Sequence, residues 1–324
     1  MPNLELANFV CKFGEDKVLL DFYEQVVLPA FKTKDFRKWR NNEYVLHQVK
    51  ENIIKDGDKE IRIISGRIIK NTTLISRQIL IDGELVQRKK RLKTSPSSFF
   101  ILYVDSHKFA FVPEMSFSPS ISDFEYSMAW FLKKSHTRYL KILQGKTRSL
   151  NKEEKTIVRF LDSAHAPTLK KLKEIVPTPT LTITSIGVQS SLAKFINSYD
   201  ILKSVNIQLL PVNEEIDSDD LFRALRAEKE KVRSTTTSLV HKNTKDGLNK
   251  KRIIDHLSSI NAAGNHLITT SGFDDHGNTQ QGSNADFKLK RSVESLPPNT
   301  ESAGAFVHGE IIQMIQSGII GNIL

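Results

Sequence analysis

The stretch "LVQRKKRLKTSPSSFFILYVDSHKFAFVPE" (residues 85–114) combines a cation cluster, a short polar hinge and two apolar runs. Five cations fall within six residues: Arg88, Lys89, Lys90, Arg91 and Lys93. The two apolar runs flank a polar turn at residues 105–108, a pattern typical of a β-hairpin. We interpret the Phe-rich hairpin as core, and the cations as one wall of an anion-binding cleft at the edge of a folded sheet.

Further elements are predicted on both sides of this stretch. Residues 60–89 interleave Ile, Arg and Thr and contain Asp82-Gly83, a strong signal for a β-hairpin turn. Residues 120–146 predict a helix with a capping box formed by Ser122 and Glu125. Residues 3–12 predict a first strand, and a helical stripe follows that Pro29 ends.

The second half of the chain alternates predicted strands and helices. Strands are expected at 181–186 and 205–211, helices at 190–204 and 218–234, a hairpin around 275–278, and a helix in the tail from residue 305. These elements predict an α+β fold of two domains, each a mostly antiparallel sheet with packed helices. We expect a basic domain over residues 1–160 and a second domain with the C-terminal helix over 161–324, because Pro177 and Pro179 interrupt local order.

Charge is distributed unevenly along the 324 residues. The whole chain carries 47 Lys and Arg against 37 Asp and Glu, whereas residues 1–150 alone carry 26 against 17. This asymmetry favours a polyanionic partner for the first half. The single cysteine, Cys11, excludes an intramolecular disulfide framework, and no signal peptide or uncharged 18-residue apolar run is found. We therefore expect a cytoplasmic protein.

The strongest functional signal is a set of cation clusters in the first half. Serine, threonine and asparagine side chains interleave with the cations, a composition that suits phosphate contacts better than base readout. Within the expected helix, Lys134, Arg138 and Lys141 share one face. The residues expected to contact DNA are Arg37, Lys38, Arg40, Arg67, Lys70, Arg77, Arg88, Lys89, Lys90, Arg91, Lys93, Lys133, Lys134, Arg138, Lys141 and Arg148.

Aromatic side chains lie close to the first of these clusters. Trp39 and Tyr44 flank Arg40 in sequence and could stack on unpaired bases, although aromatic residues in such a region are more often core.

Enzymatic motifs are absent from the sequence. It contains no phosphate-binding glycine loop, no nucleophile elbow and no HExxH helix, so we expect no cofactor and no catalytic residue. Two alternatives stay open. A metal-dependent nuclease would use Asp82, Glu84 and Lys89, or Asp105 and Lys108, to hold Mg²⁺ and polarise a phosphate. A protein–protein adaptor would carry its basic face incidentally.

Three segments resemble a known family. The segment "SSFFILYVDSHKFAFVPEMSFSPSISDFEYSMAWFL" (97–132) joins an apolar hairpin, a Ser/Pro-rich stretch and a helix that begins at Ser122-Asp123-Phe124. The segment "ILKSVNIQLLPV" (201–212) reads as a helix end followed by an amphipathic strand, and "AGNHLITTSGFDDHGNT" (263–279) reads as a closing hairpin after a basic helix. All three are similar to the RexA-like phage-exclusion proteins of lambda-type phages, and the resemblance covers about half of the chain.

The resemblance implies a DNA-binding component of anti-phage defence or superinfection exclusion. Such a protein would bind DNA with little sequence specificity in a basic cleft, form a homodimer and signal to a membrane-protein partner. The DNA-contacting residues above come from charge clustering and are not carried over from the family. The sequence thus predicts a non-enzymatic DNA-binding protein.

Overall fold

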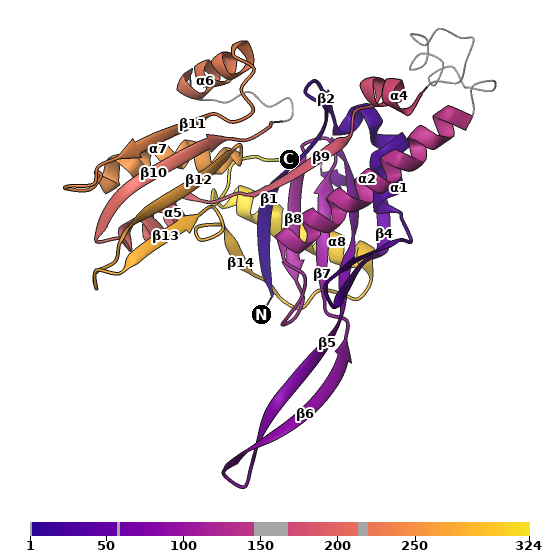
Figure 1. The fold of residues 1–324 in the computed structure, drawn as a ribbon, viewed down its shortest axis with the longest axis horizontal. Helices are drawn as coiled ribbons and strands as arrows, with labels where there is room; N and C mark the ends of the chain where they lie inside the picture. Colours follow the sequence, from indigo (N-terminus) through magenta and orange to yellow (C-terminus); the bar gives the residue numbers. More distant parts are fainter. Residues whose placement is uncertain (1, 57–58, 146–167, 213–219) are drawn as a thin grey trace.

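The chain forms two antiparallel sheets with packed helices, as a computed structural model shows (Figure 1). The structure describes residues 2–56, 59–145, 168–212 and 220–324. Over these residues the predicted α+β class is confirmed. None of the helices in the described ranges is long and apolar enough to cross a membrane.

The large sheet has the strand order β14-β1-β8-β7-β5-β4-β3, with β2 and β9 paired to β1 and β6 paired to β5. Its strands are β1 (Asn3–Phe13), β2 (Lys17–Val18), β3 (Phe36–Trp39), β4 (Asn42–Asp56), β5 (Lys59–Ile81), β6 (Glu84–Thr94), β7 (Ser97–Tyr103), β8 (Lys108–Pro113), β9 (Pro179–Ser185) and β14 (Lys290–Ser292). The predicted hairpin at residues 97–113 is therefore confirmed and supplies two central strands.

Both faces of the large sheet are covered, which explains why β7 and β8 are almost continuously apolar. One face packs Phe100 and Phe109 against Phe124 of helix α2 (Ile121–Gly145). The other face packs alternate residues, including Phe99, against helix α8 (Thr300–Gln316). The segment between β2 and β3 adds η1 (Leu19–Phe22), η2 (Tyr23–Val27) and α1 (Leu28–Phe31) to the first layer.

The small sheet has the order β11-β10-β12-β13 and its own core. Its strands are β10 (Ile201–Leu209), β11 (Ser238–Lys242), β12 (His266–Phe273) and β13 (Thr279–Ser283). The accompanying helices are α5 (Gln189–Asn197), α6 (Asp220–Lys231) and α7 (Lys250–Ala263), while α4 (Leu169–Ile175) packs beside α2. The hairpin predicted around residues 275–278 is confirmed as the β12–β13 connection.

The two chain halves do not each build one sheet. β9, β14 and α8 come from the second half, yet they pair with β1 or pack on the large sheet. The large sheet also contacts the small-sheet unit, because Asn8 Nδ2 of β1 donates to Oδ1 of Asn265, the residue before β12, at 2.9 Å in a buried contact. The expected domain boundary at residue 160 lies outside the described residues and stays a prediction.

A two-stranded arm projects from the large sheet (Figure 1). β5 pairs with β7 up to Ile69 and with β4 up to Asn71, and beyond Asn71 it pairs with β6 alone. We call residues 72–94 the β5–β6 arm. The arm turns at Asp82 (φ 48°) and Gly83 (φ 84°), where both residues have positive φ as a type I′ turn requires. The turn predicted at Asp82-Gly83 is therefore confirmed.

Several local predictions were wrong. The helix expected over residues 190–204 ends at Asn197, and residues 201–204 belong to strand β10. The capping box of α2 is formed by Ser120 and Asp123, because Ser120 Oγ accepts from the Asp123 amide and the Asp123 carboxylate accepts from the Ser120 amide. Pro29 lies in the first turn of α1 rather than ending a helix, since the missing proline amide is tolerated there. The C-terminal helix ends at Gln316, before the last residues of the tail.

Candidate nucleic-acid interface

The β5–β6 arm gathers five of the sixteen predicted contacts on one face. Strand pairing sets Ile75 opposite Arg91 and Thr73 opposite Lys93, and a register shift after Ser76 leaves Arg77 facing Arg88 and Lys89. Because side chains alternate along a strand, Arg77, Lys89, Arg91 and Lys93 share this face, and the bulge opposite Arg77 sets Arg88 beside them. The five cations are Arg77, Arg88, Lys89, Arg91 and Lys93. All five are exposed, and none forms an ion pair within the described part of the chain.

The opposite face of the arm is largely apolar. Leu80 pairs with Leu85, and Leu74 pairs with Leu92, with Lys90 on the same face. Leu80 is 69% exposed and Leu85 is 65% exposed, so no other part of the described chain covers these side chains. The cations predicted to line a cleft thus lie on a projecting ribbon, because neither β4 nor β7 is long enough to pair with residues beyond Asn71.

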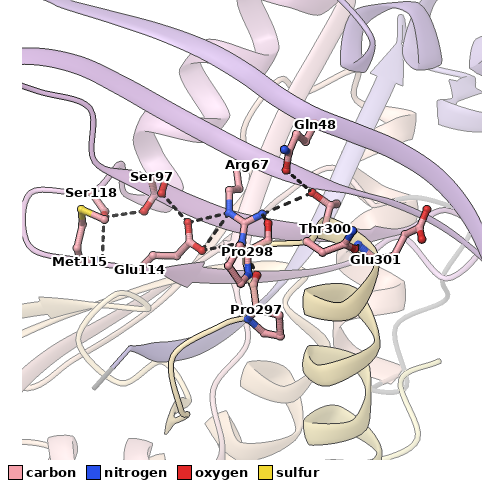
Figure 2. A network of polar contacts seen from close by, with 11 residues as sticks. Gln48, Arg67, Ser97, Glu114, Met115, Ser118, Pro297, Pro298, Thr300 and Glu301 are labelled. Atoms are coloured by element: carbon pink, nitrogen blue, oxygen red, sulfur yellow. Dashed lines mark hydrogen bonds and ion pairs between the residues drawn. The ribbon is translucent and has the colours of Figure 1, made fainter.

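Arg67 has a structural position in place of the predicted DNA contact. It is 8% exposed, and its guanidinium donates to Glu114 Oε1 at 3.0 Å from Nε, and to the carbonyl oxygens of Pro297 (2.8 Å) and Pro298 (3.0 Å) (Figure 2). Glu114 also accepts a hydrogen bond from Ser97 Oγ at 2.6 Å. These contacts tie the start of α8 to the large sheet. They occupy the N–H donors of Arg67, so its guanidinium is not available to a phosphate.

Two further predicted residues have different outcomes. Lys70 lies half-buried at the root of the arm, opposite Tyr44 in the β4–β5 register. Arg148 lies outside the described residues.

A second surface forms where the β3–β4 hairpin meets α2, and we call it the β3–α2 surface. Arg37 and Trp39 of β3 face α2, because Arg37 Nη1 donates to Ser127 Oγ at 3.4 Å. From α2, Lys134 Nζ and Arg138 Nη2 reach the Asp35 carboxylate, at 3.1 and 2.5 Å. Two of the predicted cation clusters therefore meet here.

The remaining predicted cations border this surface. Lys38 pairs with Glu43 at 3.4 Å on the opposite face of β3, and Arg40 lies at the hairpin tip. Lys133 and Lys141 are exposed on α2. The register places Glu43 opposite Asn71, so the hairpin tip lies at the root of the arm.

Asp35 organises the cations of the β3–α2 surface. Desolvation raises the pKa of this carboxyl, but hydrogen bonds from Lys134, Thr33 and Arg138 outweigh it and hold the pKa below its ordinary value. Asp35 therefore stays ionised at neutral pH and fixes two long side chains beside β3.

The two aromatic candidates have different environments. Tyr44 is buried at 2% exposure and donates to Asp123 Oδ1 at 2.8 Å. Burial and this carboxylate raise its pKa to about 12, so Tyr44 belongs to the core. Trp39 is 53% exposed, with the Arg37 guanidinium carbon 5.3 Å from its ring centroid.

Trp130 joins the β3–α2 surface and was missed in the sequence. It is 36% exposed, and Lys134 Nζ lies 4.7 Å from its ring centroid. The sequence did contain a signal for Trp130. It lies four residues before Lys134 in the predicted helix, and this spacing places the two side chains on one helix face.

The carboxylates considered for a nuclease are not brought together. Asp82 and Glu84 occupy the arm turn, while Asp105 pairs with Arg62 at 2.7 Å in the β7–β8 turn. Among the described residues, the one group of three potential metal ligands is Asp274, Asp275 and His276 in the β12–β13 turn. The Asp274 carboxylate accepts from the backbone amides of His276 and Asn278, which are turn contacts.

Comparison with known proteins assigns this chain to no family. No protein-family model matches this sequence, and no curated protein matches it significantly. The resemblance to RexA-like proteins stays a prediction.

Proposed function

We propose that the protein binds DNA with little sequence specificity through the cationic face of the β5–β6 arm. The observation that carries the proposal is the set of five exposed cations, none of which forms an ion pair within the described residues, on one face of a ribbon that projects from the large sheet. A two-stranded ribbon fits the major groove of B-DNA, and its cations are close enough to phosphates to release counterions.

The residue types on this face support phosphate binding over sequence readout. Arginine and lysine dominate, and the intervening side chains are Thr73, Ile75, Ile79 and Val86, which offer little for the base edges. Binding is therefore dominated by charge, so its affinity falls steeply with salt and depends little on sequence. The defence role, the homodimer and the membrane-protein partner belong to this proposal only through the RexA resemblance.

A fluorescence anisotropy titration tests the proposal. The variant changes Arg88, Lys89, Arg91 and Lys93 to glutamine, and binding to a labelled duplex is measured at several salt concentrations between about 50 and 200 mM, with and without Mg²⁺. Losing four phosphate contacts should lower the slope of log K against log salt by about 3 to 4, equally for unrelated sequences.

A charge-matched control separates the arm from net charge. Lys242, Lys245, Lys251 and Arg252 are exposed cations of the small-sheet unit. Changing these four to glutamine removes the same charge and should leave the slope nearly unchanged. Equal losses in both variants would contradict an arm-specific site. Cleavage of the duplex that requires Mg²⁺ would favour the nuclease alternative.

A further inference from the structure

The β3–α2 surface has features that duplex binding does not require. Phosphates can be bound by cations alone, whereas this surface also exposes two tryptophan rings beside its cations. Trp39 and Trp130 are the only tryptophans in the chain. In a duplex each base face is covered by the neighbouring base pair, so an exposed indole ring finds no free base face on which to stack.

The helix face that carries Trp130 points toward the β3–β4 hairpin. Residues 123, 127, 130, 134 and 138 follow helical spacing, and four of them make contacts on that side. Asp123 accepts from Tyr44, Ser127 accepts from Arg37, and Lys134 and Arg138 bind Asp35. Trp130 therefore lies on the same side of α2 as Arg37 and Trp39.

Cations hold these rings in place. The Arg37 guanidinium lies 5.3 Å from the Trp39 ring centroid and 5.8 Å from that of Tyr44, and its Nη1 bonds Ser127. The Arg40 guanidinium carbon is 5.9 Å from the Trp39 centroid, and Lys134 Nζ is 4.7 Å from that of Trp130. Such cation–π contacts fix the orientation of exposed rings.

The charge of the surface selects the ligand. Residues 35–43 and 127–141 together carry seven cations against two carboxylates, Asp35 and Glu43, and Asp35 is already neutralised by Lys134 and Arg138. A ligand that brings both negative charge and flat π-faces matches this combination. Single-stranded nucleic acid is such a ligand, since each of its unpaired bases offers a stacking face beside a phosphate.

We infer that the β3–α2 surface binds single-stranded nucleic acid by stacking unpaired bases on Trp39 and Trp130, with Arg37, Arg40 and Lys134 at the phosphates. β3 is the edge strand of the large sheet, so the backbone beside Trp39 is open to a passing chain. This site is distinct from the cationic face of the arm and does not depend on duplex binding there.

Binding of a labelled oligo(dT) of about 12 nucleotides tests the inference. Trp39→Ala and Trp130→Ala should each weaken binding by about 5- to 100-fold, the range of one lost base-stacking contact. Neither change should alter affinity for duplex DNA more than about twofold. The arm variant with four glutamines should show the reverse pattern: weaker binding to duplex DNA and little change in binding to oligo(dT). The two proposals can therefore fail independently in this experiment.

Matched controls come from two other exposed aromatic residues. Phe36 is 50% exposed on the opposite face of β3, and Phe117 is 66% exposed in the segment between β8 and α2. Phe36→Ala and Phe117→Ala should leave oligo(dT) affinity unchanged. Equal weakening by the controls, or no weakening by the tryptophan variants, would overturn the inference, as would a wild-type protein that does not bind oligo(dT).

Tryptophan fluorescence gives a second readout that loss of fold would not mimic. Trp130→Phe leaves Trp39 as the sole tryptophan, and Trp39→Phe leaves Trp130. Stacking of thymine on the indole should quench each single-tryptophan protein as oligo(dT) is added, with the same midpoint as the binding curve. An emission signal that stays constant through saturation would show that the bases do not stack on that ring.

Discussion

The two halves of β5 use arginine in opposite ways. In the inner half, which pairs with β4 and β7, Arg67 is buried and its guanidinium bonds Glu114 and two backbone carbonyls. In the outer half, which pairs with β6 alone, Arg77 is exposed beside four more cations. One strand of 23 residues thus carries a structural arginine and a cationic surface.

The difference lies in the neighbours, not in the residue type. Where β4, β7 and α8 surround β5, an arginine must satisfy its donors internally because water is excluded. Where two strands stand alone, the side chains on each face remain in water. Charge clustering in a sequence therefore identifies a possible anion site only after buried cations such as Arg67 have been removed.

The largest expected effect comes from breaking the internal contact. Glu114→Ala leaves the Arg67 charge buried without its carboxylate and should lower the free energy of unfolding by about 3 kcal/mol. Urea denaturation followed by circular dichroism measures this loss. Glu114→Gln keeps a hydrogen-bond acceptor for Arg67 and should lose less. An unfolding free energy unchanged in both variants would mean that the inner half does not depend on this contact.

The second prediction concerns the glycines of the two halves. A Cβ at Gly66 would lie 2.8 Å from Val49 Cγ2 and 3.0 Å from Val49 Cα, where β4 bulges against β5. Gly66→Ala should therefore lower stability by about 1–3 kcal/mol through overpacking.

Gly83→Ala gives the contrast. Nothing lies within 4 Å of its Cβ position, and the change adds only the strain of a positive φ (84°), of about 1–2 kcal/mol. This strain should loosen the arm tip, so hydrogen exchange should rise at residues 79–86 and stay unchanged in β7. Faster exchange throughout the large sheet would contradict the independence of the arm.

A smaller effect is expected at the root of the arm. Arg40 has φ 54° at the β3–β4 turn, a conformation that glycine adopts without strain. Arg40→Gly should raise the unfolding free energy by about 0.5–1 kcal/mol, because relief of strain outweighs the added freedom of the unfolded chain. Thermal unfolding measures the gain. A loss of stability would show that the contact of Arg40 with Trp39 contributes more than the strain.

The smallest effect on stability per substituted residue is expected on the arm itself. Changing Arg88, Lys89, Arg91 and Lys93 to glutamine should alter the unfolding free energy by no more than about 0.5 kcal/mol per site, since these side chains make no ion pairs within the described residues. Urea denaturation of the four-site variant measures it. A large loss would mean that the cations support the fold and were misassigned as a free surface.

Local sequence signals predicted the elements that depend on local chemistry. The hairpin at residues 97–113 and the Asp82-Gly83 turn follow from alternation and turn residues, and both are confirmed. The projection of the arm could not be predicted, because it depends on where β4 and β7 stop pairing with β5.

The candidate site shows the same division. Cation clusters were visible in the sequence, but the burial of Arg67 depends on Glu114 and on Pro297 and Pro298, more than 200 residues away. The meeting of β3 with α2 likewise joins Asp35 to Arg138 across 103 residues. Contacts of this kind are set by tertiary packing and leave no local pattern in the chain.

Hydrogen exchange with and without duplex DNA tests the central claim most directly, because it compares the two halves of β5 in one experiment. In the free protein, amides of residues 74–92 should exchange much faster than those of residues 63–69, since a two-stranded ribbon is marginally stable alone. Adding duplex DNA should slow exchange in residues 74–92 and leave residues 63–69 unchanged. Unchanged exchange on the arm under saturating DNA would contradict the account.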